Sequence, residues 1–193
     1  MSIVSAPLIG LYSSVPGSGK STLAGILAAH GFVVLPFAGT IKRMLRLCLE
    51  DLGLSLGEIE EAMGPGKNEP LAALGGRTPR YAMQTLGTEW GRGLDPMLWT
   101  RAWRQQATAA LKVGRGVVVD DMRFLSEAQM VRLLGGATVR VHRPEHAVDE
   151  VITAHASEGG LDLWAFDLDL HNDGSLEPLE EKAVALLQLM GRA

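Results

Sequence analysis

The chain has 193 residues, of which 47% are hydrophobic and 21% charged, and its formal net charge is −4. This length suffices for one domain with its own core, and the composition excludes a disordered or fibrous chain. A single cysteine, Cys48, excludes a disulfide framework and a cysteine-rich zinc site, and it suits a reducing cytosol. The acidic balance argues against nucleic-acid partners, and no apolar run approaches the roughly 18 residues of a membrane span. We therefore expect a cytoplasmic protein.

Apolar runs alternate with helical patterns along the chain, which predicts an α/β fold around a largely parallel, five-stranded sheet. The expected strands are residues 8–13, 32–36, 116–121, 137–142 and 163–170. The expected helices are residues 20–30, 40–52, 56–63, 79–90, 97–112, 126–134 and 176–190, with Ser55, Thr78 and Asp95 as N-terminal caps of three of them. Residues 64–77 are rich in glycine and proline, which predicts a long loop of functional or mobile character.

The strongest motif is Ser-Val-Pro-Gly-Ser-Gly-Lys-Ser-Thr at residues 14–22, between the first strand and the first helix. This context defines a P-loop, in which glycines let backbone N–H groups surround a phosphate at a helix N-terminus. Lys20 is expected at the β- and γ-phosphates, and the hydroxyl of Ser21 at Mg²⁺. Ser14 stands where the usual pattern has glycine, and it fits the turn if its φ is negative. The predicted ATP-binding residues here are Val15, Pro16, Gly17, Ser18, Gly19, Lys20, Ser21 and Thr22. The competing interpretation is a glycine-rich turn with a chance lysine.

Two carboxylates end the apolar strand at residues 116–121, namely Asp120 and Asp121. In P-loop folds an acid at such a strand end helps to hold Mg²⁺ or its waters. Side chains alternate along a strand, so only one of the two is expected to face the metal, and the pattern does not decide which. The alternative is that both cap the following turn.

The helix at residues 78–92 has two contrasting faces at 100° per residue. One face carries apolar residues expected in the core, Met83, Leu86 and Trp90. The opposite face carries Arg80, Gln84, Gly87 and Gly91. The guanidinium of Arg80 can bind a phosphate through two parallel hydrogen bonds, and the amide of Gln84 can form hydrogen bonds with the edge of a nucleotide base. The glycines leave room for a ligand. Further cations for the same anion are Lys42, Arg77 and Arg92. The alternative is a solvated face whose glycines permit tight packing.

Taken together, these pieces resemble phage-type deoxynucleoside monophosphate kinases, which are P-loop kinases of the nucleoside monophosphate kinase group. Besides the P-loop, the matching segments are residues 37–42 (Phe-Ala-Gly-Thr-Ile-Lys), 78–80 (Thr-Pro-Arg), 84–89 (Gln-Thr-Leu-Gly-Thr-Glu), Trp99, 121–124 (Asp-Met-Arg-Phe), Glu127, 155–158 (His-Ala-Ser-Glu) and 172–176 (Asn-Asp-Gly-Ser-Leu). Their order and spacing, rather than any single segment, carry the resemblance over nearly the whole chain. One departure is Gly39-Thr40, where the family often has Asp-Pro.

The resemblance implies one three-layer α/β/α domain over residues 1–193, with an acceptor-binding helical region at 37–95 and a lid at about 143–160. It implies Mg²⁺-dependent transfer of the ATP γ-phosphate to a deoxynucleoside monophosphate. The residues it places at the catalytic centre are Lys20, Arg80, Asp121, Arg123 and Arg143, with Asp121 favoured over Asp120 for the metal. Asn172 and Gly174 pass near the adenine, and Lys42, Arg77, Arg80, Gln84 and Arg92 line the acceptor side. Candidates in the lid are Arg143, His146 and His155.

Two other functions share the P-loop. The chain could phosphorylate another small phosphorylated acceptor, such as phosphomevalonate or dephospho-coenzyme A, or it could be a nucleotide-binding switch without transfer. Gln84 on the arginine helix favours a nucleotide acceptor. The preferred base stays open, as does a homodimer, and a phage-encoded chain would act in the host cytoplasm.

Overall fold

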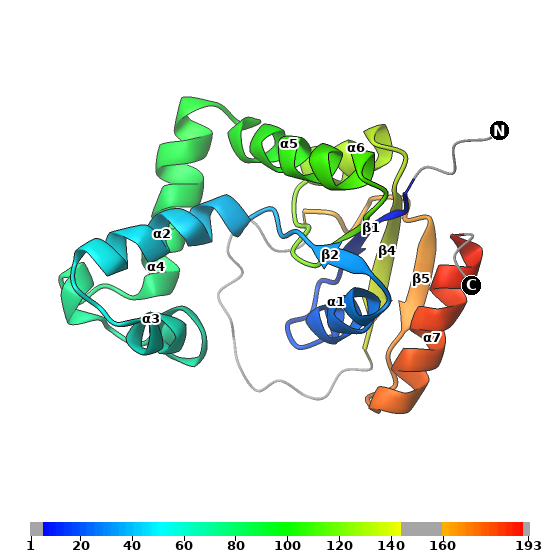
Figure 1. Ribbon diagram of the computed structural model, residues 1–193, viewed down its shortest axis with the longest axis horizontal. Coiled ribbons are helices and arrows are strands. Elements are labelled where there is room, and N and C mark those ends of the chain that lie inside the picture. Colours follow the sequence, from blue (N-terminus) through cyan, green and yellow to red (C-terminus); the bar gives the residue numbers. More distant parts are fainter. Residues whose placement is uncertain (1–5, 144–159, 191–193) are drawn as a thin grey trace. The chain divides into compact units, whose positions relative to one another are not determined.

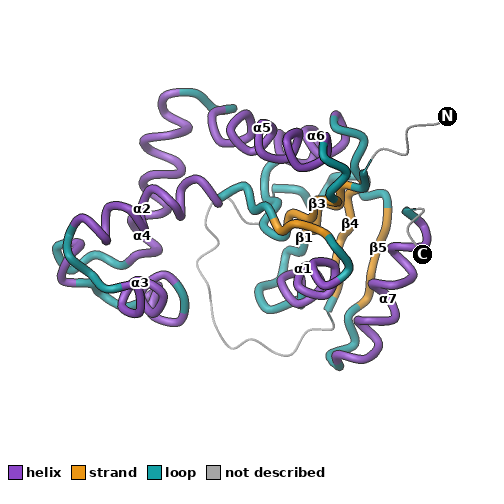
Figure 2. The backbone as a smooth tube through the Cα atoms, viewed as in Figure 1, coloured by secondary structure: helices purple, strands orange, loops and turns teal. Residues whose placement is uncertain are grey.

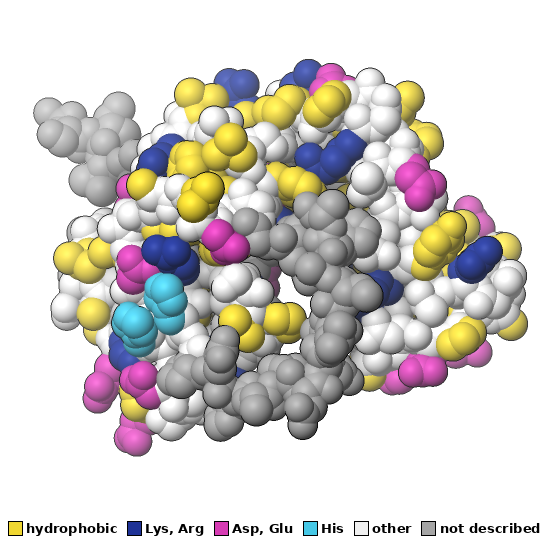
Figure 3. All heavy atoms as spheres, turned by 180° about the vertical axis from the view of Figure 1, so that it is seen from behind, with side chains coloured by type: hydrophobic (Ala, Val, Ile, Leu, Met, Phe, Trp, Pro, Cys, Tyr) yellow, Lys and Arg dark blue, Asp and Glu magenta, His cyan; other side chains and the backbone are white. Residues whose placement is uncertain are grey.

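The computed structural model describes residues 6–143 and 160–190 (Figure 1). The chain divides into two compact units, the first made of Met1–Phe37 and Arg104–Ala193 and the second of Ala38–Trp103. The second unit overlaps the helical region expected at 37–95 and extends beyond it to Trp103. Within the described residues no helix is long and apolar enough to cross a membrane. On the face shown in Figure 3, lysine and arginine side chains lie among acidic ones rather than in one basic patch.

The first unit is built on a five-stranded sheet in the order β2-β3-β1-β4-β5, and every neighbouring pair is parallel (Figure 2). The strands are β1 (Leu8–Tyr12), β2 (Phe32–Val34), β3 (Gly116–Val119), β4 (Ala137–His142) and β5 (Leu168–His171). This confirms the predicted α/β fold. The last strand is shorter than predicted, because residues 160–164 form turns before it.

Helices cover both faces of this sheet, as the uninterrupted apolar strands require. On one face Ile9, Leu11 and Val139 share a core with α1 (Lys20–Ala29) and α7 (Leu176–Leu189). On the other face lies α6 (Leu125–Leu133), where a Cβ added to Gly10 would stand 3.1 Å from Val131. The result is the expected α/β/α layering, with the carboxyl ends of all five strands at one edge.

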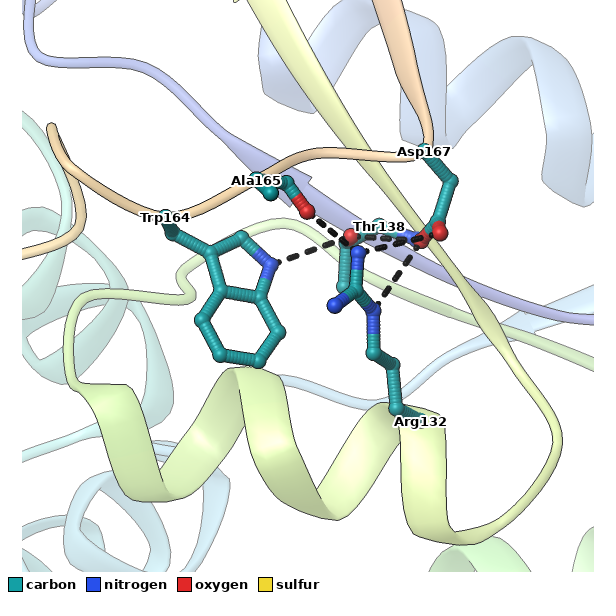
Figure 4. A network of polar contacts seen from close by, with 5 residues as sticks. All are labelled: Arg132, Thr138, Trp164, Ala165 and Asp167. Atoms are coloured by element: carbon teal, nitrogen blue, oxygen red, sulfur yellow. Dashed lines mark hydrogen bonds and ion pairs between the residues drawn. The ribbon is translucent and has the colours of Figure 1, made fainter.

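A polar network joins α6 to the amino ends of β4 and β5 (Figure 4). Asp167 accepts hydrogen bonds from the backbone N–H of Thr138 at 2.7 Å and from its hydroxyl at 2.6 Å. Arg132 donates to Asp167 and to the carbonyl of Ala165, and its guanidinium lies 4.4 Å from the ring centre of Trp164. Burial raises the pKa of Asp167, but the bonds from Thr138 and Arg132 outweigh it and hold the pKa below its usual value. The network therefore connects α6 with the segments that enter β4 and β5, at the sheet edge opposite the P-loop.

The second unit packs around Leu45, Leu49 and Ile59. Its helices are α2 (Gly39–Asp51), α3 (Leu56–Met63) and α4 (Pro79–Thr85), followed by the π-helix η3 (Leu86–Arg92); α5 (Leu98–Lys112) continues from this unit into the first. The predicted caps Ser55 and Thr78 are confirmed, since Ser55 and Glu58 form a capping box and Thr78 accepts from the N–H of Tyr81. Asp95 instead accepts from the N–H of Met97 at 2.7 Å, in the turn before α5 begins at Leu98.

The long loop predicted at residues 64–77 is instead an ordered segment. It contains two short 3₁₀ helices, η1 (Pro65–Asn68) and η2 (Ala72–Leu74). An antiparallel bridge between Leu71 and Arg77 then closes it. Its residues Leu71 and Leu74 pack on the core of the second unit, and this packing is what the glycine and proline content alone does not reveal.

The helix with the two contrasting faces differs from its prediction in its second half. Residues 86–92 are π-helical, and Trp90, predicted in the core, is 48% exposed. Gly91 is buried instead, and a Cβ there would come within 2.2 Å of the Trp99 indole. The indole N–H of Trp99 also donates to the carbonyl of Gly87 at 2.7 Å. The space predicted for a ligand at Gly91 is therefore filled by Trp99, as the tight-packing alternative held.

Candidate active site

The P-loop lies between β1 and α1 in the conformation that its glycines permit. Gly17 has φ +70° and Gly19 has φ +93°, while no non-glycine residue in the described part of the chain has a positive φ. Ser14 thus meets the condition set for it by the sequence. Gly19 is required a second time, because a Cβ on it would lie 2.3 Å from the side-chain nitrogen of Asn172. The positive φ and the close contact with Asn172 therefore each exclude a side chain larger than a hydrogen atom at Gly19.

Lys20 lies at the start of α1, where its ammonium donates to the hydroxyl of Ser18 at 3.1 Å. Burial lowers the pKa of Lys20, the nearby Arg123 lowers it further, and Asp120 partly opposes the shift. Two cations and one carboxylate therefore act on each other at the mouth of the loop. An anionic phosphate bound there would relieve the repulsion between the two cations.

Asp120, rather than Asp121, reaches the P-loop. The hydroxyl of Ser21 donates to Oδ2 of Asp120 at 2.8 Å, whereas Oδ1 of Asp121 accepts from the backbone N–H of Phe37 at 2.7 Å. Asp121, which the resemblance favoured for the metal, points to the opposite side of the strand end from Ser21.

The pair formed by Ser21 and Asp120 fits a magnesium ion. Both donors are oxygens, the ligands that Mg²⁺ prefers. Neighbouring ligands of an octahedral ion with bonds of 2.0–2.1 Å stand about 2.9 Å apart. The separation of 2.8 Å between the two side-chain oxygens matches this spacing.

The P-loop forms one wall of a cleft of about 330 Å³ in the first unit. Its lining comprises Gly17, Ser18, Gly19, Lys20, Ser21, Thr22, Arg143, Asn172, Gly174, Ser175, Leu176 and Leu179. Segments predicted separately as ATP-binding therefore meet in one place, although more than 150 residues separate them in the chain. Val15 and Pro16 precede the lining residues, and Ser175, Leu176 and Leu179 at the start of α7 were not predicted.

Arg143 follows β4 and bridges the two sides of the cleft. Its Nη1 donates to the carbonyl of Gly17 at 2.5 Å, and its Nη2 stands 3.9 Å from the position of a Cβ on Gly174. Its Nε is buried and has no hydrogen-bond partner among the described residues. The remainder of the predicted lid, with His146 and His155, lies outside the described residues.

Asn172 lines the cleft and is also hydrogen-bonded within the protein. Only 5% of it is exposed, its amide nitrogen donates to the carbonyl of Ser18 at 2.9 Å, and its amide oxygen accepts from the N–H of Gly174 at 3.1 Å. Its backbone N–H donates to the carbonyl of His142 at 2.7 Å. Asn172 therefore ties the P-loop to the turn after β5, the turn predicted to pass near the adenine.

The residues predicted on the acceptor side all belong to the second unit. Arg80 and Gln84 lie one turn apart on α4, and Lys42 lies exposed on α2. Arg77 stacks on the ring of Tyr81, with 5.1 Å between the guanidinium carbon and the ring centre. Gly87 packs beside α2, since a Cβ on it would lie 3.3 Å from the Ile41 side chain.

Two of these arginines are held by partners that the sequence did not indicate. Nε of Arg80 donates to Oδ1 of Asn68 at 2.6 Å. Arg92, the last residue of the π-helix, donates to the carbonyl of Pro96 at 3.4 Å. Arg80 and Gln84 therefore lie on the same helix, α4, whereas Arg92 lies at the end of the following π-helix.

The parallel sheet, the P-loop and the acid at the neighbouring strand end define a P-loop kinase. Residues 77–183 match the Deoxynucleotide monophosphate kinase family. A candidate deoxynucleotide monophosphate kinase of Acanthamoeba polyphaga mimivirus is 30% identical over 190 residues, which cover 92% of this chain and 94% of the relative. The deoxynucleotide monophosphate kinase of Enterobacteria phage T4 is 30% identical over 113 residues, 58% of this chain and 46% of the phage protein. The chain belongs to the deoxynucleotide monophosphate kinase family.

Solved structures agree with the fold. A crystal structure from Thermus thermophilus covers 96% of this chain and 98% of its own at a TM-score of 0.53 and 24% identity. The dephospho-CoA kinase from Campylobacter jejuni covers 95% of this chain and 96% of its own at 0.50 and 17%. Family membership makes the chain a phosphotransferase that uses ATP and nucleotide substrates, and sets aside the other acceptors and the switch considered from the sequence.

Proposed function

We propose that the chain transfers the γ-phosphate of ATP to the 5′-phosphate of a deoxynucleoside monophosphate by in-line displacement, giving ADP and the deoxynucleoside diphosphate. The observation that carries this proposal is the cleft in which the P-loop, Arg143 and the turn after Asn172 meet. Its cradle of backbone N–H groups and its cations suit a polyphosphate. The turn at Gly174 and the apolar Leu176 and Leu179 suit the base of the same nucleotide.

On the donor side, Lys20 and Arg123 supply the positive charge. Phosphoryl transfer depends mainly on positioning and on charge stabilisation, so cations prearranged in a half-buried site are effective. Lys20 binds the β- and γ-phosphates from the first turn of α1. Arg143, which also lines the cleft, adds its positive charge near the polyphosphate.

Ser21 and Asp120 would hold Mg²⁺ at this site. When bound, the ion neutralises the β- and γ-phosphates and orients the leaving group. Asp120 also accepts the hydroxyl hydrogen of Ser21, which keeps both oxygens on one side of the loop. Asp121 supports the site indirectly, by fixing the chain at Phe37, just before the second unit begins.

On the acceptor side, the guanidinium of Arg80 grips the monophosphate and Gln84 contacts the base edge. The two side chains stand one turn apart on α4 and can therefore contact one ligand together. Lys42, Arg77 and Arg92 add positive charge to the second unit. Arg80 is exposed and Gln84 is partly exposed, whereas the space beside Gly91 is filled by Trp99.

A coupled assay of ADP release tests the proposal. The four common deoxynucleoside monophosphates, phosphomevalonate and dephospho-coenzyme A serve as acceptors. We expect release that depends on a deoxynucleoside monophosphate, and a fall in kcat of about 100-fold or more in Lys20→Ala. Lys112→Ala, which removes an exposed lysine at the end of α5, is the matched control. ADP release that is independent of the nucleotide acceptor, or normal turnover in Lys20→Ala, contradicts the proposal.

A further inference from the structure

The hydrogen bond between Arg80 and Asn68 joins α4 to a turn twelve residues earlier in the chain. Nε of Arg80 donates to Oδ1 of Asn68 at 2.6 Å. Within the described residues, Arg80 forms no other hydrogen bond or ion pair. Asn68 is the last residue of η1, and it contributes nothing to the core, since its side chain lies in an exposed turn. Because both side chains are exposed, this hydrogen bond does not serve to pack the core.

The turn that carries Asn68 is held in place by close packing against a helix. It packs directly on the end of α3: a Cβ on Gly64 would lie 2.8 Å from the carbonyl oxygen of Glu60, and one on Gly66 3.0 Å from that of Glu61. The N–H of Gly64 donates to the carbonyl of Glu60 at 3.0 Å. Two glycines thus allow the backbone to approach the helix closely, and Asn68 is presented from this approach.

The bond decides which edge of the Arg80 guanidinium can take a phosphate. A guanidinium binds an oxyanion in a bidentate manner either through Nε and one terminal nitrogen or through its two terminal nitrogens. With Nε committed to Asn68, the first edge is closed and the second remains. The bond also restricts rotation of a long side chain that would otherwise lose conformational freedom on binding.

We propose that Asn68 is a positioning residue for the acceptor: it holds Arg80 so that the two terminal nitrogens of the guanidinium receive the monophosphate. This inference rests on the proposed function, in which Arg80 binds that phosphate. It predicts that Asn68 acts entirely through Arg80 and does not affect ATP. Asn68 has no other task in the transfer.

A double-mutant cycle tests the inference, because lysine offers no Nε–H at the corresponding place. The four proteins are the wild type, Asn68→Ala, Arg80→Lys and the double variant. We expect Asn68→Ala to raise KM for the deoxynucleoside monophosphate about 2- to 10-fold, with a smaller change in kcat. In the Arg80→Lys background the same substitution should change KM less than 2-fold, which is the signature of coupling. The Kd of ATP and the Tm should stay at their wild-type values.

The neighbouring Glu69→Ala is the control. It truncates an exposed side chain just after the same turn and removes a negative charge, so it should not raise KM for an anionic acceptor. If Arg80→Lys raises KM and Asn68→Ala does not, or if the Asn68 effect persists in the Arg80→Lys background, the positioning role is wrong. If Arg80→Lys itself leaves the acceptor KM unchanged, the proposed role of Arg80 fails instead.

Discussion

Asp120 and Asp121 are adjacent carboxylates with different contacts, so the same substitution at each should have different effects. Asp120→Asn keeps the size of the side chain and removes the charge beside Ser21, where Mg²⁺ would bind. Asp121→Asn keeps the oxygen that accepts from Phe37 N–H. We expect the first variant to lose turnover and the second to retain most of it.

The expected magnitude follows from the distances. Two unit charges about 4 Å apart interact by about 4 kcal/mol at an effective dielectric constant of about 20. Partial exposure of Asp120 reduces this to about 2–3 kcal/mol, which corresponds to a fall in kcat/KM of about 30- to 150-fold. For Asp121→Asn we expect less than about a 5-fold fall, because the amide oxygen can still accept from the N–H of Phe37.

Steady-state kinetics at several Mg²⁺ concentrations separate the two variants. Asp120→Asn should also need more Mg²⁺ for half-maximal activity, whereas the requirement of Asp121→Asn should match the wild type. The Tm of each variant controls for unfolding. A larger loss in Asp121→Asn, or an unchanged Mg²⁺ requirement in Asp120→Asn, would refute the assignment of the metal site to Asp120.

Three further predictions concern single residues. Gly19→Ala, at φ +93° and with a Cβ 2.3 Å from a side-chain amide, should weaken ATP binding more than 10-fold and lower the Tm, as calorimetry will show. Lys20→Met should raise the Tm of the ligand-free protein at pH 7, because burial disfavours the charged ammonium of Lys20. This difference in Tm should shrink as the pH rises from the lowered pKa of Lys20 toward its ordinary pKa of 10.5, because the folded wild type loses the ammonium proton before the unfolded chain does and so gains stability. Gly91→Ala should cost about 1–3 kcal/mol against the indole of Trp99, seen as a Tm lower by about 2–10 °C, whereas Gly93→Ala, with open space around it, should not.

The fold was predictable where local pattern and packing agree. The order of the elements could be predicted from local signals. These signals are the apolar strands buried on both faces, the helix caps such as Ser55, and the glycines that follow helices. The P-loop was predictable for the same reason: its residues are contiguous and their chemistry requires that spacing. The π-helix was not predictable from the periodicity, and neither was the close approach of Gly91 within it to Trp99, a contact made only in the folded chain.

The candidate site was predictable in its composition and less so in its contacts. Alternation shows that Asp120 and Asp121 diverge, but which of them meets Ser21 depends on how β3 lies beside β1. Asn172 was expected near the ligand, but its hydrogen bond to the carbonyl of Ser18 was not predictable, because the two residues meet only in the folded chain. Asn68 carried no signal at all, since its partner is reached only through the fold of an ordered loop.

The central claim is that the chain phosphorylates deoxynucleoside monophosphates with ATP. The most direct measurement is the identification of both products by chromatography after incubation with ATP, Mg²⁺ and one deoxynucleoside monophosphate. We predict that ADP and the deoxynucleoside diphosphate form in equal amounts, and that neither forms in Lys20→Ala above about 1% of the wild-type rate. ADP without the diphosphate, for every deoxynucleoside monophosphate supplied, would contradict the claim.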